Sequence, residues 1–288
     1  MNDKPLASRH TTTSRLKNSV RRDLKVLIGL VVITVEVFAA VFAPFVMPHN
    51  PDSQEYKMLA SPSFKHPLGT DEFGRDLLSR IIAGARVSLL VGISSVVLAI
   101  MLGVPLGLLS GYFGGWVDIL LQRIVDLIWS FPNLIIAVGM MAVLGPGLLN
   151  VIIAISVAYV DDFARISRGE VLNIREEEYV IAIRALGANS LRVLVRHVLP
   201  NSMAPIIVVG TVSISYAILA ESTLSFLGLG VRITTPTWGI ILNSAREFFT
   251  TSWWLGIFPG LAIMVTVLSI NFVGDWMRDF LDVKVREV

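Results

Sequence analysis

Long apolar stretches separated by short polar segments dominate this chain. Each stretch is roughly 20 residues long, and a helix of that length spans the hydrocarbon core of a bilayer, which is about 30 Å thick. The pattern predicts an all-α, polytopic membrane protein with six transmembrane helices. We place the six spans at 25–46, 87–110, 124–144, 148–165, 204–227 and 254–274.

The composition agrees with this pattern. Hydrophobic residues make up 54% of the chain and charged residues only 16%, and the mean hydropathy is +0.70. Such values exclude an ordinary soluble domain. The first apolar stretch is longer than the core of a cleaved signal peptide, about 7 to 15 residues, so we expect a membrane anchor. Cysteine is absent, which excludes disulfides and thiolate metal sites.

The basic residues predict the orientation. Seven of the 24 lysines and arginines lie in the first 25 residues, and such a bias marks the cytoplasmic side of a membrane. An even number of spans returns the segment 275–288 to the same side. With both termini cytoplasmic, sixteen basic residues lie on the cytoplasmic side and seven outside. We interpret the basic cytoplasmic tail at 1–24 as a disordered orientation signal and expect no nucleic-acid partner.

A polar segment at 176–200 interrupts the apolar pattern and is the leading candidate for a functional surface. We expect a short helix that ends at Gly187, because glycine provides the backbone freedom of a helix C-terminus. Asn189 or Ser190 can cap a second helix. The expected structure is a helical hairpin.

The second helix of this hairpin is predicted to be amphipathic. It should stop at Leu199, because Pro200 disfavours helical backbone in the residue before it. Its apolar face should comprise four residues at helical spacing, Leu191, Leu194, Val195 and Val198. Arg192 and Arg196 should form a basic face on the opposite side.

Five carboxylates in or beside the predicted spans are candidates for function, because a charge inside a bilayer is costly. They are Glu36, Asp126, Asp161, Asp162 and Glu221. Simple ion pairs offer one interpretation, with Asp126 bound to Arg123 and Asp161 bound to Arg165. Alternatively, Asp161 and Asp162 line the inner mouth of a path for cations. For Glu36 the simpler alternative is a partner on another helix.

The segment 47–86 is predicted to be an external loop that leads into an interfacial helix. That helix carries an apolar stripe of Leu77, Leu78, Ile81 and Ile82. His66 in the loop has no second histidine at ligand spacing, so we expect a structural residue and no metal site. Further along, Pro132 predicts a kink in the third span.

Several segments resemble the permeases of ABC importers. The family's cytoplasmic loop has a Glu-Ala-Ala motif at the positions of Ile181, Ala182 and Ile183. Because Ile181 replaces the motif's Glu, a role of that Glu does not transfer to this chain. The motif continues with a Gly, matched by Gly187, and a Leu-Pro pair, matched by Leu199 and Pro200. The string HPLGTDEFGRDLLSRIIAGARVSLLVG at 66–92, together with 111–132 and 218–239, is similar to dipeptide, oligopeptide and nickel importer permeases.

This resemblance implies a type I ABC importer permease fold, with an ABC transmembrane type-1 domain at 86–275 in a bacterial-type inner membrane. The chain contains no GxxxxGK[ST] loop. ATP and Mg²⁺ would therefore bind two separate ATP-binding subunits, and this chain would hold no cofactor. The resemblance also implies a second, related permease, an extracytoplasmic substrate-binding protein and coupling through the hairpin. Dipeptides, longer peptides and metal complexes all stay open as substrates.

Two other classes of membrane protein fit this sequence less well. A proton-coupled secondary transporter would use Glu36, Asp126 and Glu221 as proton carriers, but we find no internal repeat of the kind many carriers show. An intramembrane metalloprotease is excluded, because His10, His49, His66 and His197 form no HExxH pattern.

Overall fold

The computed structural model describes residues 12–286, with side chains for residues 24–281. Within these limits the chain is helical and forms no strand, so the predicted all-α class is confirmed. The helices are α1 Thr12–Val41, α2 Ala43–Val46, α3 Leu77–Phe113, α4 Gly115–Trp129, α5 Asn133–Leu144, α6 Leu148–Ala158, α7 Val160–Ile174, α8 Glu178–Ala185, α9 Ser190–Val193, the π-helical turn η1 Leu194–Val198, α10 Leu199–Phe226, α11 Trp238–Ala245 and α12 Trp254–Arg286.

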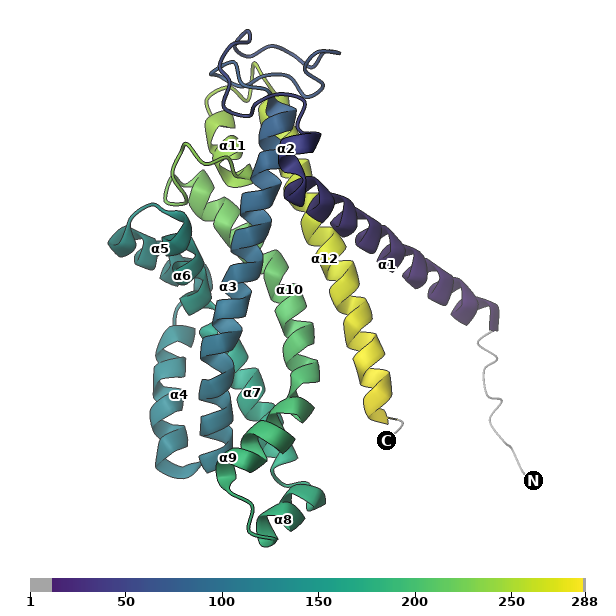
Figure 1. The fold of residues 1–288 in the computed structure, drawn as a ribbon, viewed down its shortest axis with the longest axis vertical. Helices are drawn as coiled ribbons and strands as arrows, with labels where there is room; N and C mark the ends of the chain where they lie inside the picture. The colour runs from purple at the N-terminus through teal and green to yellow at the C-terminus, as the bar shows by residue number, and fades with distance from the viewer. Residues whose placement is uncertain (1–11, 287–288) are drawn as a thin grey trace, which may run out of the picture.

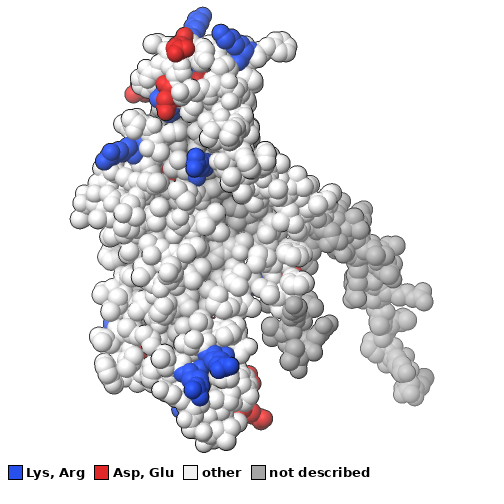
Figure 2. All heavy atoms as spheres, viewed as in Figure 1, with Lys and Arg blue, Asp and Glu red and all other residues white. Residues whose placement is uncertain are grey.

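The long helices α3, α10 and α12 run along the length of the molecule (Figure 1). The loop between α2 and α3 lies at one end beside α11, and the hairpin of α8 and α9 lies at the opposite end. On the face drawn in Figure 2, charged side chains gather at these two ends, and an almost uncharged band separates them. This distribution suits a protein whose middle lies in lipid.

Four described helices are long and apolar enough to cross a membrane, and a fifth span results if the bent pair α4 and α5 counts as one. The six predicted spans are therefore not matched one for one. Pro132 does mark the break in the third span, but the two halves turn by 88°, far more than a kink. The fourth span is divided at Tyr159 into α6 and α7, and α6 has only 11 residues.

Two predictions about the first half of the chain were wrong. Residues 12–24, expected to be disordered, belong to α1, because extending an existing helix is far easier than starting one. Residues 1–11 of the tail lie outside the described residues, as does His10. No separate interfacial helix forms, since the stripe from Leu77 to Ile82 makes the first turns of α3. Asp76 starts α3 by accepting a hydrogen bond from the Ser79 backbone N–H.

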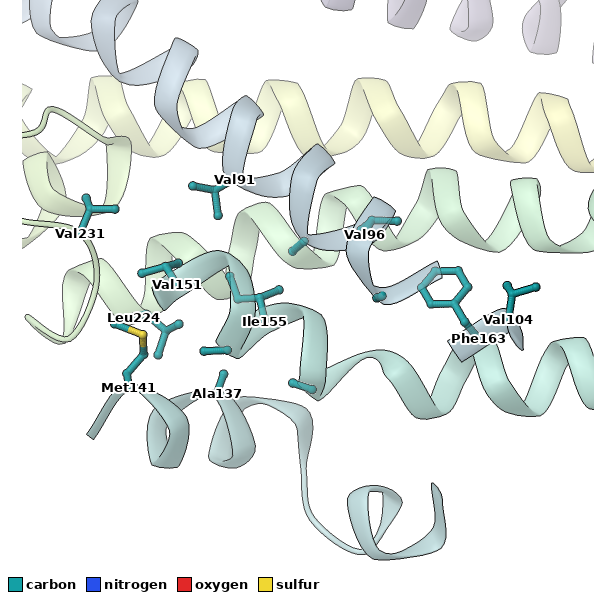
Figure 3. Packing of buried hydrophobic residues seen from close by; sticks show 14 of the residues in the cluster. Val91, Val96, Val104, Ala137, Met141, Val151, Ile155, Phe163, Leu224 and Val231 are labelled. Atoms are coloured by element: carbon teal, nitrogen blue, oxygen red, sulfur yellow. The ribbon is translucent and has the colours of Figure 1, made fainter. Parts of the chain in front are cut away.

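The largest cluster of buried apolar side chains lies where α3, α5, α6, α7 and α10 meet. Val91, Met141, Val151, Ile155 and Leu224 converge from four of these helices and are buried (Figure 3). At the other end of the core, Phe163 of α7 packs beside Val104 of α3.

Glycines bring α3 and α7 unusually close together. Gly103, Gly107 and Gly111 repeat at every fourth residue on the face of α3 that meets α7. A Cβ at Gly103 would lie 2.8 Å from Phe163 Cβ, and one at Gly111 would lie 2.9 Å from Val171 Cβ. Small residues at this spacing let helix backbones approach in membranes.

Candidate functional site

The hairpin predicted at 176–200 is present, and its turn has the expected chemistry. Helix α8 ends before Gly187, which has a φ of +84°, a conformation that glycine adopts without strain. The Asn189 side chain accepts a hydrogen bond from the Leu191 backbone N–H at 3.2 Å. Asn189 is therefore the cap of the second helix.

The prediction that the second helix stops at Leu199 was wrong. The chain passes from α9 through one π-helical turn, Leu194–Val198, directly into α10. Pro200 lies directly after this π turn, in the first turn of α10, and the Leu199 N–H bonds to the Leu194 carbonyl in the π pattern. Residues Ser190–Phe226 thus form one uninterrupted helical segment of 37 residues.

The buried face of the hairpin differs from the predicted one. Val180, Val193, Leu194 and Val198 are buried in a small core with Val171 of α7. Leu191 and Val195 were expected on this face but are 67% and 57% exposed. The π turn changes the angular spacing of the residues, so the regular 3.6-residue period fails. Arg192 and Arg196 are exposed, as predicted.

Apolar side chains also lie exposed on the first arm and turn of the hairpin. Leu186 at the turn is 88% exposed and Ile181 of α8 is 53% exposed. Ala182 is also exposed, whereas Ile183 packs against the small core beneath. Contiguous exposed apolar groups are typical of surfaces that bind another protein or a membrane.

Polar contacts fix the hairpin to the rest of the molecule. The Asn201 amide donates to the Tyr179 hydroxyl at 3.0 Å, which joins α10 to α8. Arg175, at the end of α7, donates to the Gly111 carbonyl of α3 at 2.7 Å. The hairpin is therefore held at both of its ends.

The predicted ion pairs of Asp126 and Asp161 are replaced by one pair between helices. Arg165 of α7 donates to Asp126 of α4 at 2.7 Å, and its guanidinium lies 4.0 Å from the Trp129 ring. Arg123 is exposed on α4. Both carboxylate oxygens of Asp161 are buried and accept no side-chain hydrogen bond from the described residues. Tertiary packing therefore decides which groups pair, and the spacing of three or four residues along one helix does not.

Sequence reasoning missed a second pair between the same helices. Arg168 donates to both carboxylate oxygens of Asp118, at 2.7 and 2.6 Å, and Ser110 of α3 also donates to Asp118. These bidentate contacts join α7 to α4 across the end of α3. The available indication was that α4 and α7 carry side chains of opposite charge.

The two remaining carboxylates are partnered inside the helix bundle. Glu36 of α1 accepts a hydrogen bond from Thr266 of α12 at 2.8 Å, which agrees with the simpler interpretation. Glu221 of α10 is fully buried and accepts from Ser88 at 3.1 Å and from Ser225 at 2.7 Å. The Thr266 and Ser88 contacts join helices, and no described contact links the two groups into a relay.

A cavity of about 700 Å³ opens between α7, α10 and α12. Its polar lining includes Asp162, Glu170, Tyr216, Asp275 and Arg278. Asp162 thus faces this cavity, whereas its neighbour Asp161 is buried. The two carboxylates therefore do not act as one pair at the mouth of a path.

Comparison with known proteins identifies the family. Residues 103–287 match the family described as "Binding-protein-dependent transport system inner membrane component". The chain belongs to this permease family. Residues 21–66 of the permease also match the N-terminal transmembrane domain of oligopeptide transport permease C.

Curated relatives match the permease over most of its length. It is 39% identical to the dipeptide transport system permease protein DppC of Alkalihalophilus pseudofirmus, over 99% of this chain and 95% of the relative. It is 45% identical to the di/tripeptide transport system permease protein DppC of Pseudomonas aeruginosa, over 90% and 88%. A chain of the inward-facing MetNI methionine ABC transporter has the same fold, with a TM-score of 0.57, 19% identity and coverage of 69% and 95%.

These matches confirm the predicted class. The chain is a multi-pass permease subunit of an ABC importer with the type I fold, and not an enzyme, since ATP hydrolysis belongs to a separate subunit in such importers. The family match argues against the secondary-transporter alternative. The matched region begins at residue 103, so the domain limits of 86–275 stay a prediction.

The pairing of Asp126 predicts a mild phenotype for Asp126→Asn. The pair is substantially exposed, with side-chain exposures of 51% for Asp126 and 36% for Arg165, so its loss should cost less than about 1 kcal/mol. Thermal unfolding of the purified complex, in a double-mutant cycle with Arg165→Gln, measures this coupling. Uptake should persist. Complete loss of uptake by Asp126→Asn in an intact complex would instead indicate a carrier role for the carboxylate.

Proposed function

We propose that this permease forms half of the translocation pathway of a peptide importer and receives the conformational signal of ATP binding through its hairpin. The observation that carries the proposal is the uninterrupted helical segment Ser190–Phe226. No flexible loop separates the hairpin from the spanning part of α10. A force applied to the hairpin would therefore move the spanning helix with it.

The proposed coupling residues have distinct roles in the hairpin and at its junction with α10. Ile181 and Ala182 present an exposed surface to the ATPase, and Ile183 anchors that surface to the small core. Gly187 sets the angle between the two arms. Leu199 and Pro200 lie at the change from the π turn to α10. At this point, motion of the hairpin would be transmitted to the membrane-spanning helix.

The proposed assembly contains two ATP-binding subunits, a second related permease and an extracytoplasmic substrate-binding protein. ATP and Mg²⁺ would bind the ATP-binding subunits. The basic residues favour a cytoplasmic position for both termini and for the hairpin. Exposed apolar side chains along α1 and α4, such as Val35 and Leu127, suit contact with lipid or with the second permease.

Small peptides are the proposed substrates. The two curated relatives are named for dipeptides and for di- and tripeptides. The 700 Å³ cavity suits a ligand of this size. Its lining carries acidic Asp162, Glu170 and Asp275 and basic Arg278, so both ends of a zwitterionic peptide would find an opposite charge. The second permease would close the open side of this cavity.

Gly187→Val tests the role of the hairpin. The left-handed backbone strains a β-branched residue although no atom lies within 4 Å of the new Cβ, at a local cost of about 1 to 3 kcal/mol. We expect normal membrane insertion, weaker copurification of the ATPase and loss of peptide uptake.

Two variants serve as controls for Gly187→Val. Gly187→Asn should retain more uptake, because asparagine tolerates this backbone conformation better than valine does. Ile181→Glu should be tolerated although Ile181 lies on the proposed docking surface, because the change restores the residue that the family's loop usually has at this position. Full uptake and full ATPase copurification with Gly187→Val would rule out the hairpin as the coupling element.

A further inference from the structure

Two histidines and an aspartate converge in the loop between α2 and α3, at the end of the molecule opposite the hairpin. His66 Nδ1 lies 2.8 Å from Asp76 Oδ1, and His49 Nδ1 lies 3.7 Å from the same oxygen. The three ligand atoms all lie within 4.8 Å of one another. His49 is too far from His66 in the sequence to be at ligand spacing, but the loop folds back on itself and brings the two ring centroids to 4.9 Å from each other.

Surrounding contacts hold these three side chains in place. Asp76 Oδ2 accepts hydrogen bonds from the Ser79 backbone N–H at 2.9 Å and from its hydroxyl at 2.7 Å, which leaves Oδ1 directed at the histidines. The His49 backbone N–H donates to Ser79 Oγ at 3.1 Å. The Tyr56 ring packs on both imidazoles, with centroid distances of 5.1 and 4.4 Å. Such outer contacts orient ligands in metal sites.

One nitrogen atom of the cluster has no hydrogen-bond partner within the part of the chain that the structure describes. His49 Nδ1 is buried and makes no hydrogen bond with the described residues, and 3.7 Å is too long for one to Asp76. A buried, unpartnered ring nitrogen is costly and suits a bond to a cation.

We propose that His49, His66 and Asp76 bind a divalent transition-metal ion of the Zn²⁺ type. Two imidazoles and one carboxylate form a common Zn²⁺ donor set, whereas Mg²⁺ and Ca²⁺ prefer oxygen ligands. Zn²⁺ bonds of about 2.0–2.1 Å in tetrahedral geometry separate ligand atoms by roughly 3.3 Å. The distances of 2.8 and 3.7 Å from the two imidazoles to Asp76 Oδ1 bracket this separation, and all three ligand atoms lie within 4.8 Å of one another, so side-chain rotations would have to close the set around an ion.

Solvent and ions would reach this site past the His49 side chain. The His49 side chain is 21% exposed and borders a cavity of about 480 Å³ with Pro44, Met47, Pro48, Asn50 and Pro51. Solvent from this cavity supplies the fourth ligand. The bound ion links the loop after α2 to the first turn of α3, and so fixes the loop on which His49 and His66 lie. This role is structural and does not depend on the substrate or on the ATPase.

Zinc titration of the purified, chelator-stripped importer tests the proposal. The wild-type importer should bind one more Zn²⁺ ion per permease chain than the His49→Ala variant does. His49→Ala keeps the backbone bond to Ser79 and the bond between His66 and Asp76, so the loop stays folded. It should weaken binding by more than about 100-fold, since losing even an outer partner of a ligand costs up to that factor. His197→Ala, in the hairpin, is the matched control and should bind Zn²⁺ as wild type does.

Two further measurements keep the test decisive if His49→Ala misfolds. X-ray absorption of the Zn²⁺-loaded wild type should show two imidazoles among its nitrogen and oxygen ligands. Zn²⁺ should also slow hydrogen exchange at 47–76 in wild type and not in His49→Ala. Equal Zn²⁺ binding by wild type and folded His49→Ala, or an absorption spectrum without imidazole ligands, would overturn the proposal.

Discussion

Gly107→Val should abolish the folded permease. Gly107 lies in the middle of the glycine stripe of α3, where a Cβ would overlap the Ala164 carbonyl oxygen of α7 and lie 2.7 Å from Ser167 Cβ. The backbone carbonyl cannot rotate away, so the two helices must separate along the core that contains Phe163. We expect a cost above about 3 kcal/mol, the upper end for overpacked cores. Yield and size-exclusion profile of the purified permease measure the effect.

Gly169→Ala is the matched control for this prediction. Gly169 lies on α7 itself, with no atom within 4 Å of an added Cβ. Alanine there should leave the fold intact or stabilise it by up to about 1 kcal/mol, because alanine favours helix more than glycine does. A monodisperse Gly107→Val protein with wild-type thermal unfolding would show that the close contact of α3 and α7 is not required.

Leu186→Glu should eliminate peptide uptake without unfolding the permease. The side chain is 88% exposed at the hairpin turn, so the folded subunit does not depend on it. In the proposed assembly the same leucine is buried against the ATPase, where an unpaired carboxylate would cost several kcal/mol. We therefore expect normal amounts of permease in the membrane, with little copurified ATPase and uptake near background.

Leu186→Met keeps an apolar side chain of similar volume and should retain uptake and ATPase copurification. Leu186→Glu with wild-type uptake would mean that the turn faces solvent in the working importer. The exposed leucine would then have no partner, and the docking surface would have to lie elsewhere on the hairpin.

Local chemistry explains what the sequence could predict. The apolar stretches located α1, α3, α10 and α12 because each is long enough to span a bilayer by itself. The turn of the hairpin followed from Gly187 and Asn189, whose conformation and capping depend only on neighbouring residues. The pattern of apolar and polar residues therefore carries the class of fold and the position of the hairpin.

Long-range packing explains what the sequence could not predict. Pro200 was expected to end a helix, but a π turn before it lets the chain continue into α10. Arg165 is four residues from Asp161 yet bonds to Asp126 on another helix. His49 and His66 meet at Asp76 only because the loop folds back. Each outcome depends on contacts between segments that spacing along the chain does not encode.

Crosslinking from the hairpin turn tests the coupling proposal most directly. The chain has no cysteine, so Leu186→Cys provides a single attachment point for a photoactivatable maleimide in the purified importer. Met58→Cys, 63% exposed in the loop at the opposite end, is the control. We predict that Leu186→Cys crosslinks to the subunit that carries the GxxxxGK[ST] loop, with a yield that changes on ATP binding, and that Met58→Cys does not. ATPase crosslinks from Met58→Cys and none from Leu186→Cys would contradict the proposed coupling and orientation.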